Sequence, residues 1–224
     1  ILGGTGSGKS TLMYLLDRLY PLSPENGRIE IGGVDIADIS SDWLRRNIGM
    51  VLQEPFLFSR TLEENIAIAS GQEPEDGKDG EHSRLARVRS AARIARLDET
   101  ITHFAKGYDT FVGERGVTLS GGQKQRTAIA QMLIRKPPIM VLDDSLSAVD
   151  AETDAEIRKA LRENVGSATV ILIAHRLTTL MHADQILVMD QGRIVQRGTH
   201  EELLAQDGIY RQIYDLQVRQ SGSR

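Results

Sequence analysis

Residues 3–10 read Gly3-Gly-Thr-Gly-Ser-Gly8-Lys9-Ser10, and the apolar stretch Thr11-Leu-Met-Tyr-Leu-Leu16 follows directly. Glycines let backbone amides curl around phosphate oxygens, a lysine in this position reaches the β- and γ-phosphates, and the serine hydroxyl ligates Mg²⁺. A helix after the loop directs its positive end at the same anion. The stretch predicts a phosphate-binding P-loop rather than an ordinary glycine-rich turn. The predicted nucleotide-binding residues here are Gly3, Gly4, Thr5, Gly6, Ser7, Gly8, Lys9, Ser10 and Thr11.

A second motif, Ile139-Met-Val-Leu-Asp143-Asp144, joins four apolar residues to two carboxylates. A buried strand that ends in Asp delivers a carboxylate to the Mg²⁺ of a P-loop. The alternative, a strand that ends in a helix-capping Asp, is less favoured because a P-loop is present in the same chain. Asp143, with Ser10, is therefore a predicted metal ligand.

A third motif, Leu119-Ser-Gly-Gly-Gln123, begins a predicted helix that runs to about residue 135. Ser120 and Gln123 fit the capping box, in which each side chain satisfies a free amide of the first turn. The two glycines between them leave the helix N-terminus uncovered, and such a terminus attracts anions. Ser120, Gly121, Gly122 and Gln123 are therefore predicted to form a second phosphate-binding surface.

Composition bounds what the chain does. It has 224 residues, 40% of them hydrophobic, which is enough for a core. A net charge of −4 excludes a protein held on nucleic acid by bulk charge alone. The absence of Cys excludes disulfides, thiolate metal sites and a Cys nucleophile. No apolar run approaches the roughly 20 residues that span a bilayer, so we expect the chain itself to be soluble; docking on a membrane component is compatible with this.

Strands and helices alternate on both sides of a mostly helical middle, which predicts an α/β fold with a helical insertion at residues 55–135. Capping boxes are expected at Thr61, Thr153 and Thr199. The polar, acidic segment 71–82 is expected to be a mobile surface loop. Strands are expected at 28–31, 48–52, 139–142, 169–174, 185–189 and 193–196, and the other helices at 9–19, 83–96 and 153–164 and after Thr199.

In this order, the three motifs resemble the nucleotide-binding domain of ATP-binding cassette (ABC) proteins, over nearly the whole chain. The resemblance implies a RecA-like P-loop NTPase core with a mostly parallel sheet at residues 1–54 and 136–224, and a helical signature subdomain at 55–135. It implies ATP and Mg²⁺ as cofactors. It also implies a head-to-tail dimer, in which each ATP lies between the P-loop of one domain and the Ser120 helix of the other.

The resemblance assigns roles to residues that are uninformative on their own. Gln53 matches the family's Q-loop glutamine, which senses Mg²⁺ and water, and is a predicted metal and catalytic residue. His175, at the end of a predicted strand, matches the switch histidine that contacts the γ-phosphate. The segment 147–150, Ser-Ala-Val-Asp, matches the D-loop, which meets the partner domain.

The segment 51–66, which ends in Thr61-Leu-Glu-Glu-Asn-Ile66, and the segment 113–116 resemble the exporter branch of the family. The corresponding stretches of that branch contact coupling helices of a membrane domain, and here we expect these contacts near 53–59 and Glu114. We therefore expect an ATPase that drives export, located at the cytoplasmic face of the plasma membrane, with no nucleic-acid partner. The chain opens on the P-loop, so an upstream strand and a transmembrane domain are expected to be missing. A soluble cassette ATPase acting on DNA or ribosomes and a non-hydrolysing nucleotide-binding regulator are the alternatives.

One position departs from the family pattern. Asp144 stands where the family usually has the Glu that polarises the attacking water, and its carboxylate is one methylene closer to the backbone. Displacing a base by about 1 Å costs on the order of 10²-fold in rate. We therefore expect this chain to be one half of a heterodimeric exporter, the half that carries a slow ATP site. A homodimer in which Asp144 works through a reoriented water is the alternative. The transported substrate and the adenine-stacking residue are not readable.

The arginines in the predicted helix 83–96 have two interpretations. They contact lipid headgroups or nucleic acid, or they form a solvated helix face beside an acidic loop, which is the favoured interpretation. These residues are Arg84, Arg87, Arg89, Arg93 and Arg96.

Overall fold

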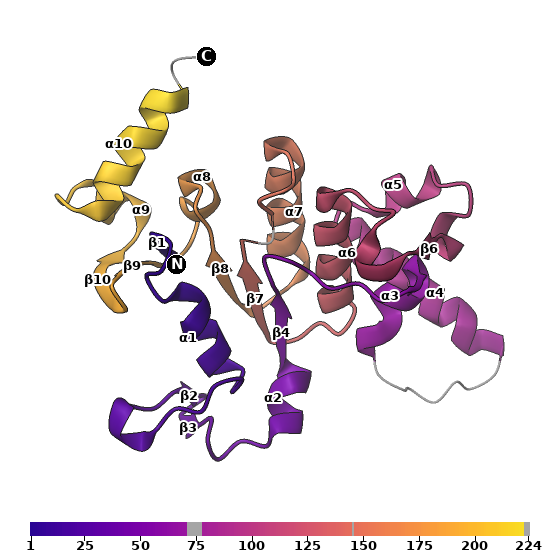
Figure 1. Cartoon of the computed structure of the whole chain (residues 1–224), viewed down its shortest axis with the longest axis horizontal. Helices are drawn as coiled ribbons and strands as arrows, with labels where there is room; N and C mark the ends of the chain where they lie inside the picture. Colours follow the sequence, from indigo (N-terminus) through magenta and orange to yellow (C-terminus); the bar gives the residue numbers. More distant parts are fainter. Residues whose placement is uncertain (71–77, 145, 222–224) are drawn as a thin grey trace. The chain divides into compact units, whose positions relative to one another are not determined.

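The chain divides into two compact units. The first unit consists of residues 1–45 and 171–224 and contains the predicted P-loop, and the second unit consists of residues 46–170. The computed structural model describes residues 1–70, 78–144 and 146–221 (Figure 1). Two elements cross the boundaries between the units, α2 (Ser41–Asn47) and β8 (Thr169–Ile173).

Short strands and helices make up the first unit. Its other elements are β1 (Leu2–Gly3), α1 (Lys9–Leu16), the 3₁₀ turn η1 (Pro24–Asn26), β2 (Glu30–Ile31), β3 (Val34–Asp35), α8 (Leu177–Leu180), β9 (Ile186–Asp190), β10 (Arg193–Gly198), α9 (His200–Leu204) and α10 (Ile209–Ser221). In its main sheet β9 lies between β1, which is parallel to it, and β10, which is antiparallel. The strands β2 and β3 form a separate hairpin.

One apolar cluster holds this unit together. It joins β1 and β9 to the helices that follow β8, so burial of the same side chains fixes both the strand before the P-loop and the C-terminal helices. The buried members are Leu2, Ala174, Leu177, Leu180, Ile186, Val188, Leu203 and Tyr210.

The second unit contains a parallel strand pair and a group of helices. Its elements are β4 (Ile48–Val51), β5 (Arg60–Thr61), α3 (Leu62–Ala67), η2 (Ile68–Ser70), α4 (Lys78–Ile94), α5 (Asp98–Thr102), η3 (Gly107–Asp109), β6 (Phe111–Val112), η4 (Glu114–Gly116), α6 (Gly121–Leu133), β7 (Ile139–Asp143) and α7 (Ala151–Asn164). The sheet order is β4-β7-β8, with β4 parallel to β7. Helix α6 packs against α3, α4 and β4 (Figure 1).

Three capping boxes form as the sequence predicts, at Thr61 before α3, Ser120 before α6 and Thr199 before α9. In each box the hydroxyl accepts from the third amide of the helix, and a Glu or Gln side chain accepts from the N–H of the cap residue. Each box therefore fixes a helix start with local bonds alone.

The fourth expected cap is wrong. Helix α7 begins at Ala151, and its N-cap is Asp150, whose carboxylate accepts from the N–H of Thr153 at 2.9 Å. Asp is among the strongest N-cap residues, so it starts the helix one turn early and places Thr153 inside it. The bond from the Thr153 backbone is the largest of the interactions that lower the pKa of Asp150.

Helix α1 ends three residues before the predicted residue 19. Arg18 takes a left-handed conformation with φ 54°, and the N–H of Leu19 donates to the carbonyl of Tyr14 at 2.8 Å, which closes the helix. The Arg18 guanidinium donates to the carbonyls of Ile36 and Ile39 at 3.1 and 2.7 Å. These long-range hydrogen bonds hold Arg18 outside the helix and explain why α1 ends earlier than the sequence predicts.

Helix α4 begins at Lys78, so residues 78–82 are helical and not the loop that the sequence predicts; the rest of that expected loop, 71–77, lies outside the described residues. Asp98, at the start of α5, binds both Arg89 and Arg93. Arg84 pairs with Glu63, and Arg96 with Glu156. Arg93 and Arg96 are exposed, as a solvated helix face requires, whereas Arg84, Arg87 and Arg89 are half-buried. None of the helices in the described ranges has the length and apolar character needed to cross a bilayer.

Candidate functional site: phosphate cradles at two helix N-termini

The predicted P-loop wraps around the ammonium group of its own lysine. Lys9 is 6% exposed, and its Nζ donates to the carbonyls of Gly3 and Gly4 at 2.9 and 2.8 Å and to the Ser7 hydroxyl at 3.3 Å. The N–H of Gly192, in the β9–β10 turn, donates to the Ser7 carbonyl at 3.1 Å. The loop is thus braced from inside and outside, and it keeps a buried positive charge at its centre.

The helix after the loop begins without a side-chain cap. Its N-cap is Gly8, which adopts φ 94° and has no side chain to accept from the first amides of α1. A residue with a Cβ is strained in this conformation, so glycine is needed here. The uncapped amides and the helix dipole together provide a site for an anion.

His175 belongs to the same unit as the P-loop. It is exposed and lies between the end of β8 and the start of α8. Just before it, the N–H of Ala174 donates to the carbonyl of Ile1 at 3.3 Å, so the chain here runs beside the strand that enters the P-loop. His175 and the loop therefore follow neighbouring strand ends, as expected for ligand-binding residues of an α/β sheet.

Gln53, Asp143 and Asp144 come together in the second unit. In the parallel pair, Val51 of β4 lies opposite Leu142 of β7. Gln53 and Asp144 each follow two residues later, so they extend from adjacent strands at the same edge of the sheet. Gln53 is exposed and Asp143 is 6% exposed, which places a largely buried carboxylate next to an accessible amide.

The backbone of Asp144 is unusual. Its φ is 43°, in the left-handed region, and its carbonyl accepts from the N–H of Ser147 at 3.1 Å. Asp tolerates this conformation better than most residues with a Cβ because its short side chain bonds locally. The Asp144 carbonyl and the Ser147 amide are thus bonded to each other directly after β7.

The Ser120–Gln123 surface is built by the capping box of α6. The Ser120 Oγ accepts from the N–H of Gln123 at 3.3 Å, and Gln123 Oε1 accepts from the N–H of Ser120 at 2.9 Å. The box does not use the amides of Gly121 and Gly122, and the proton of the Ser120 hydroxyl is still available to donate. Ser120 is exposed, so these donors are accessible to an anion.

The matched D-loop packs against this helix start. Gln125, 4% exposed, donates from Nε2 to the Ser147 hydroxyl at 3.2 Å, and its Oε1 accepts from the N–H of Ala148 at 3.0 Å. A Cβ placed on Gly122 would lie 3.0 Å from the Ala148 carbonyl oxygen, so this close approach favours glycine. The Ser120 helix and the D-loop thus form one structural unit.

Sequence reasoning missed two residues that position these loops. Gln125 lies on the same helical stripe as Ala128, Ile129 and Met132, and a Gln on an apolar stripe is a readable sign of a buried polar partner. Asn65, fully buried in α3, accepts from the N–H of Phe58 at 2.8 Å and donates to the Phe58 carbonyl at 3.0 Å. Asn65 has no comparable sign, because one Asn after a capping box is ordinary.

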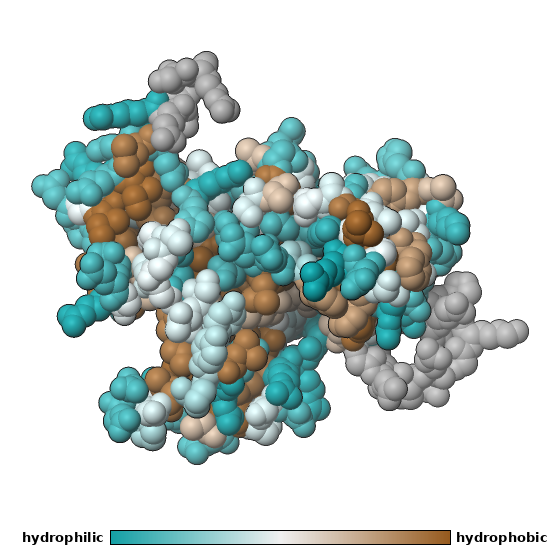
Figure 2. All heavy atoms as spheres, viewed as in Figure 1, coloured by the Kyte–Doolittle hydropathy of each residue, from teal (hydrophilic) through white to brown (hydrophobic). Residues whose placement is uncertain are grey.

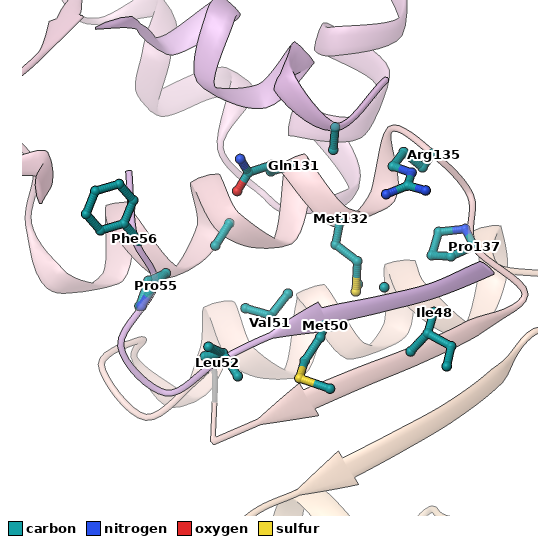
Figure 3. A pocket seen from close by; sticks show the side chains of 13 residues that line it. Ile48, Met50, Val51, Leu52, Pro55, Phe56, Gln131, Met132, Arg135 and Pro137 are labelled. Carbon is teal, nitrogen blue, oxygen red and sulfur yellow. The ribbon is translucent and has the colours of Figure 1, made fainter. Parts of the chain in front are cut away.

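The exporter-like segments 53–59 and 113–116 are brought together by a short strand pair, β5 with β6, in which Arg60 lies opposite Val112. Phe56 and Phe58 are 58% and 41% exposed, and their rings meet edge to face at 5.1 Å. Beside Phe56 is a hollow of about 260 Å³ between β4 and α6. In Figure 3 Phe56 lies at one end of it and Arg135 and Pro137 lie at the other, with Gln131 between them.

The donors at these sites fit ATP and Mg²⁺. Lys9 and the uncapped amides of α1 supply positive charge and hydrogen bonds for phosphate oxygens. Mg²⁺ is usually held by one or two carboxylates together with the substrate's phosphates. Asp143 is such a carboxylate, and Ser10 and Gln53 carry the further oxygens predicted. Within the described part of the chain no three His, Asp or Glu side chains gather as a metal cage.

Comparison with known proteins identifies the family. The sequence model of the family "ABC transporter" matches residues 1–147. The chain is 47% identical, over its whole length, to an uncharacterized ABC transporter ATP-binding protein of Bacillus subtilis, YfiB. Over 99% of its length the chain is 43% identical to multidrug resistance protein 3 of Entamoeba histolytica. It spans 36% and 16% of those two proteins.

A solved structure of a bacterial Atm1-family ABC exporter with ATP bound matches 96% of the chain at 41% identity, with a TM-score of 0.87, over 36% of the exporter chain. The resemblance inferred from the three motifs and the α/β P-loop fold class are confirmed. The chain belongs to the ABC transporter family and has the fold of its ATP-binding domain.

Proposed function

We propose that this chain is the ATP-binding and hydrolysing motor domain of an ABC exporter, working as a head-to-tail dimer. The observation that carries the proposal is the presence of two accessible helix N-termini with phosphate-binding chemistry, one after the P-loop and one at Ser120. They belong to different units of one chain. A dimer gives both a use, because the Ser120 surface of each copy closes over the nucleotide on the other copy's P-loop.

In this mechanism the loop 3–10 and Thr11 bind the triphosphate. Lys9 exchanges its bonds to the Gly3 and Gly4 carbonyls for bonds to phosphate oxygens. Ser10, Asp143 and Gln53 would hold Mg²⁺, which would neutralise charge on the phosphates. We also propose a division of the chain into a core of 1–54 and 136–224 and a helical subdomain of 55–135.

Dimer closure completes the site. The Ser120 hydroxyl and the Gly121 and Gly122 amides donate to the terminal phosphate of the partner's nucleotide, and Gln123 fixes the helix start. Asp144 orients and deprotonates the attacking water, and His175 contacts the terminal phosphate. Since Gln125 ties the Ser120 helix to the D-loop, closure moves both segments as one.

We further propose that segments 53–59 and 113–116 dock on a membrane domain at the cytoplasmic face of the plasma membrane. Aromatic residues are enriched at protein–protein interfaces. Phe56 and Phe58 are exposed, and they lie in the segment that directly follows Gln53. Asn65 fixes the backbone of Phe58, so docking is linked to a rigid element. The multidrug and exporter names of the relatives support export as the direction of transport.

The Asp144 site is proposed to be slow, as one half of a heterodimer. The shorter carboxylate arm supports this, and so does the left-handed backbone at Asp144, which limits how the side chain is aimed. Asp144 also supports the competing hypothesis, in which the chain is a regulator that binds nucleotide but does not hydrolyse it. ATP turnover in the assembled dimer distinguishes the two.

Complementation tests the proposal. Lys9→Ala removes the phosphate-binding charge and should abolish ATP binding, whereas Ser120→Arg should spare binding but block hydrolysis at the partner's site. Neither variant alone should turn over ATP. When the two full-length variants are mixed, one composite site pairs an intact Lys9 with an intact Ser120, so turnover should return.

Phosphate release is measured for each variant and for the mixture, with ATP binding measured separately. If the unsubstituted chain hydrolyses ATP without a second protein, an inactive mixture of the two variants contradicts an ATP site that is shared between two chains. Wild-type ATP binding by Lys9→Ala contradicts the P-loop assignment. If only a second, different ABC protein restores turnover to the unsubstituted chain, the heterodimer is supported.

A further inference from the structure

A side chain of the C-terminal helix binds the backbone on both sides of Arg176. Gln217 of α10 donates from Nε2 to the carbonyl of His175 at 2.8 Å, and its Oε1 accepts from the N–H of Leu177 at 3.0 Å. Forty residues separate Gln217 from Leu177 in the sequence. One amide group therefore satisfies an acceptor and a donor in the loop that carries His175.

These bonds replace the local cap that α8 lacks. Its N-cap, Arg176, makes no side-chain cap bond to the described first turn of the helix. Helix α8 spans only Leu177–Leu180, too short to be stable without outside support. Gln217 takes the first amide of α8, so the conformation of the His175 loop depends on where α10 lies.

The loop is held from the other direction by the strand before the P-loop. The N–H of Ala174 donates to the carbonyl of Ile1, one residue before His175. His175 thus lies between a bond to the P-loop strand and a bond to α10. Its side chain is exposed, so the backbone on either side must set its direction.

The start of helix α10 is anchored in the core of this unit. Tyr210 is fully buried, its N–H donates to Gln196 at 3.0 Å, and its hydroxyl lies 2.7 Å from Nδ1 of His200. Farther along, Leu216 and Val218 are 59% and 50% exposed, and Figure 2 shows hydrophobic side chains at the surface over α10. Near this end of the helix, the Gln217 side chain bonds to the loop that carries His175.

We propose that Gln217 is a positioning residue for ATP hydrolysis: through its two backbone bonds, α10 sets the orientation of His175. This inference builds on the proposed role of His175 at the terminal phosphate. It makes the C-terminal helix a point at which a change in α10 alters the rate of turnover without altering ATP binding.

The test compares Gln217→Met with Gln212→Met in the full-length protein. Methionine nearly matches glutamine in length and removes both hydrogen bonds, and Gln212 is an exposed residue of the same helix. Gln217→Met should lower kcat on the order of tenfold or more, since misplacing a reacting group by 1 Å costs up to about 10²-fold. KM for ATP should stay within about twofold, because the P-loop is untouched. Gln212→Met should match wild type.

Hydrogen exchange gives a readout that is independent of activity. The Leu177 amide should exchange faster in Gln217→Met but not in Gln212→Met. If kcat of Gln217→Met stays within twofold of Gln212→Met while His175→Ala removes turnover, the positioning role is overturned. A matching rise in KM with loss of thermal stability also overturns it, in favour of a structural role. If His175→Ala leaves turnover intact, the proposed function of His175 fails instead, whatever the exchange result.

Discussion

Replacing Asp144 with Glu should make ATP turnover faster while making the protein slightly less stable. The added methylene moves the carboxylate outward by about 1.5 Å, toward the reach of the family's usual base. If the present carboxylate is misplaced by about 1 Å, correcting it recovers on the order of 10²-fold in kcat, or about 2.7 kcal/mol of barrier. The cost arises in the backbone, because Asp144 has φ 43° and Glu adopts that region less readily.

A left-handed conformation costs roughly 1–2 kcal/mol for residues without a short bonding side chain, so Asp144→Glu should lose no more than about that much stability. A domain stable by about 5 kcal/mol or more stays folded after this loss, so the rate effect dominates. The assay is steady-state phosphate release by the assembled dimer, with denaturant unfolding alongside. Asp144→Asn is the matched control, because it keeps size and backbone preference but removes the base. Turnover of Asp144→Glu equal to or below that of Asp144 would refute the slow-site reasoning, and full activity in Asp144→Asn would remove Asp144 from catalysis.

Two further predictions concern the second unit. Gln125→Met should remove the two bonds to Ser147 and Ala148 at a cost of about 1 kcal/mol each, and hydrogen exchange at the Ala148 amide should become faster; unchanged exchange would mean that the D-loop does not depend on Gln125. Burial alone would raise the pKa of Asp98, but hydrogen bonds from Tyr108 and Arg93 and the charge of Arg89 outweigh it and lower the pKa below its ordinary 3.8. The ionised carboxylate therefore stabilises the fold above pH 3.8, and this contribution is lost as pH falls through the lowered pKa. Asp98→Asn should cost about 1–3 kcal/mol at pH 7 in denaturant unfolding, and the difference from wild type should shrink below pH 4; a difference that is constant with pH would contradict the assignment.

Features set by neighbours in the chain were predictable from the sequence. The capping boxes at Thr61, Ser120 and Thr199 form because each helix start is fixed by residues three positions apart. The strands 139–142 and 169–174 were found to within one residue, since a buried apolar run flanked by turn residues has few alternatives.

Most of what sequence reasoning missed depends on contacts between distant residues, and the cap of α7 is the local exception. Helix α1 stops early because Arg18 bonds carbonyls some twenty residues away. Asp150 rather than Thr153 caps α7, a local competition that was misread, because two candidate caps stood within four residues. Gln217 could not have been linked to His175 without the structure, since 42 residues separate them and a single Gln in an amphipathic helix is unremarkable.

In the proposed dimer Ser120 has two tasks, since it caps helix α6 and also donates to the partner's nucleotide. For starting a helix, Asp serves as well as Ser, since either oxygen accepts from the Gln123 amide. For binding a nucleotide the two residues differ, because the Asp carboxylate would repel the triphosphate and could not donate a hydrogen bond, whereas the Ser hydroxyl can donate one. Folding alone would leave the position open to several polar side chains, while in the proposed dimer the partner's nucleotide would narrow the choice to side chains that both accept and donate a hydrogen bond. Position 120 is thus a place where a protein can drift out of activity without any loss of structure.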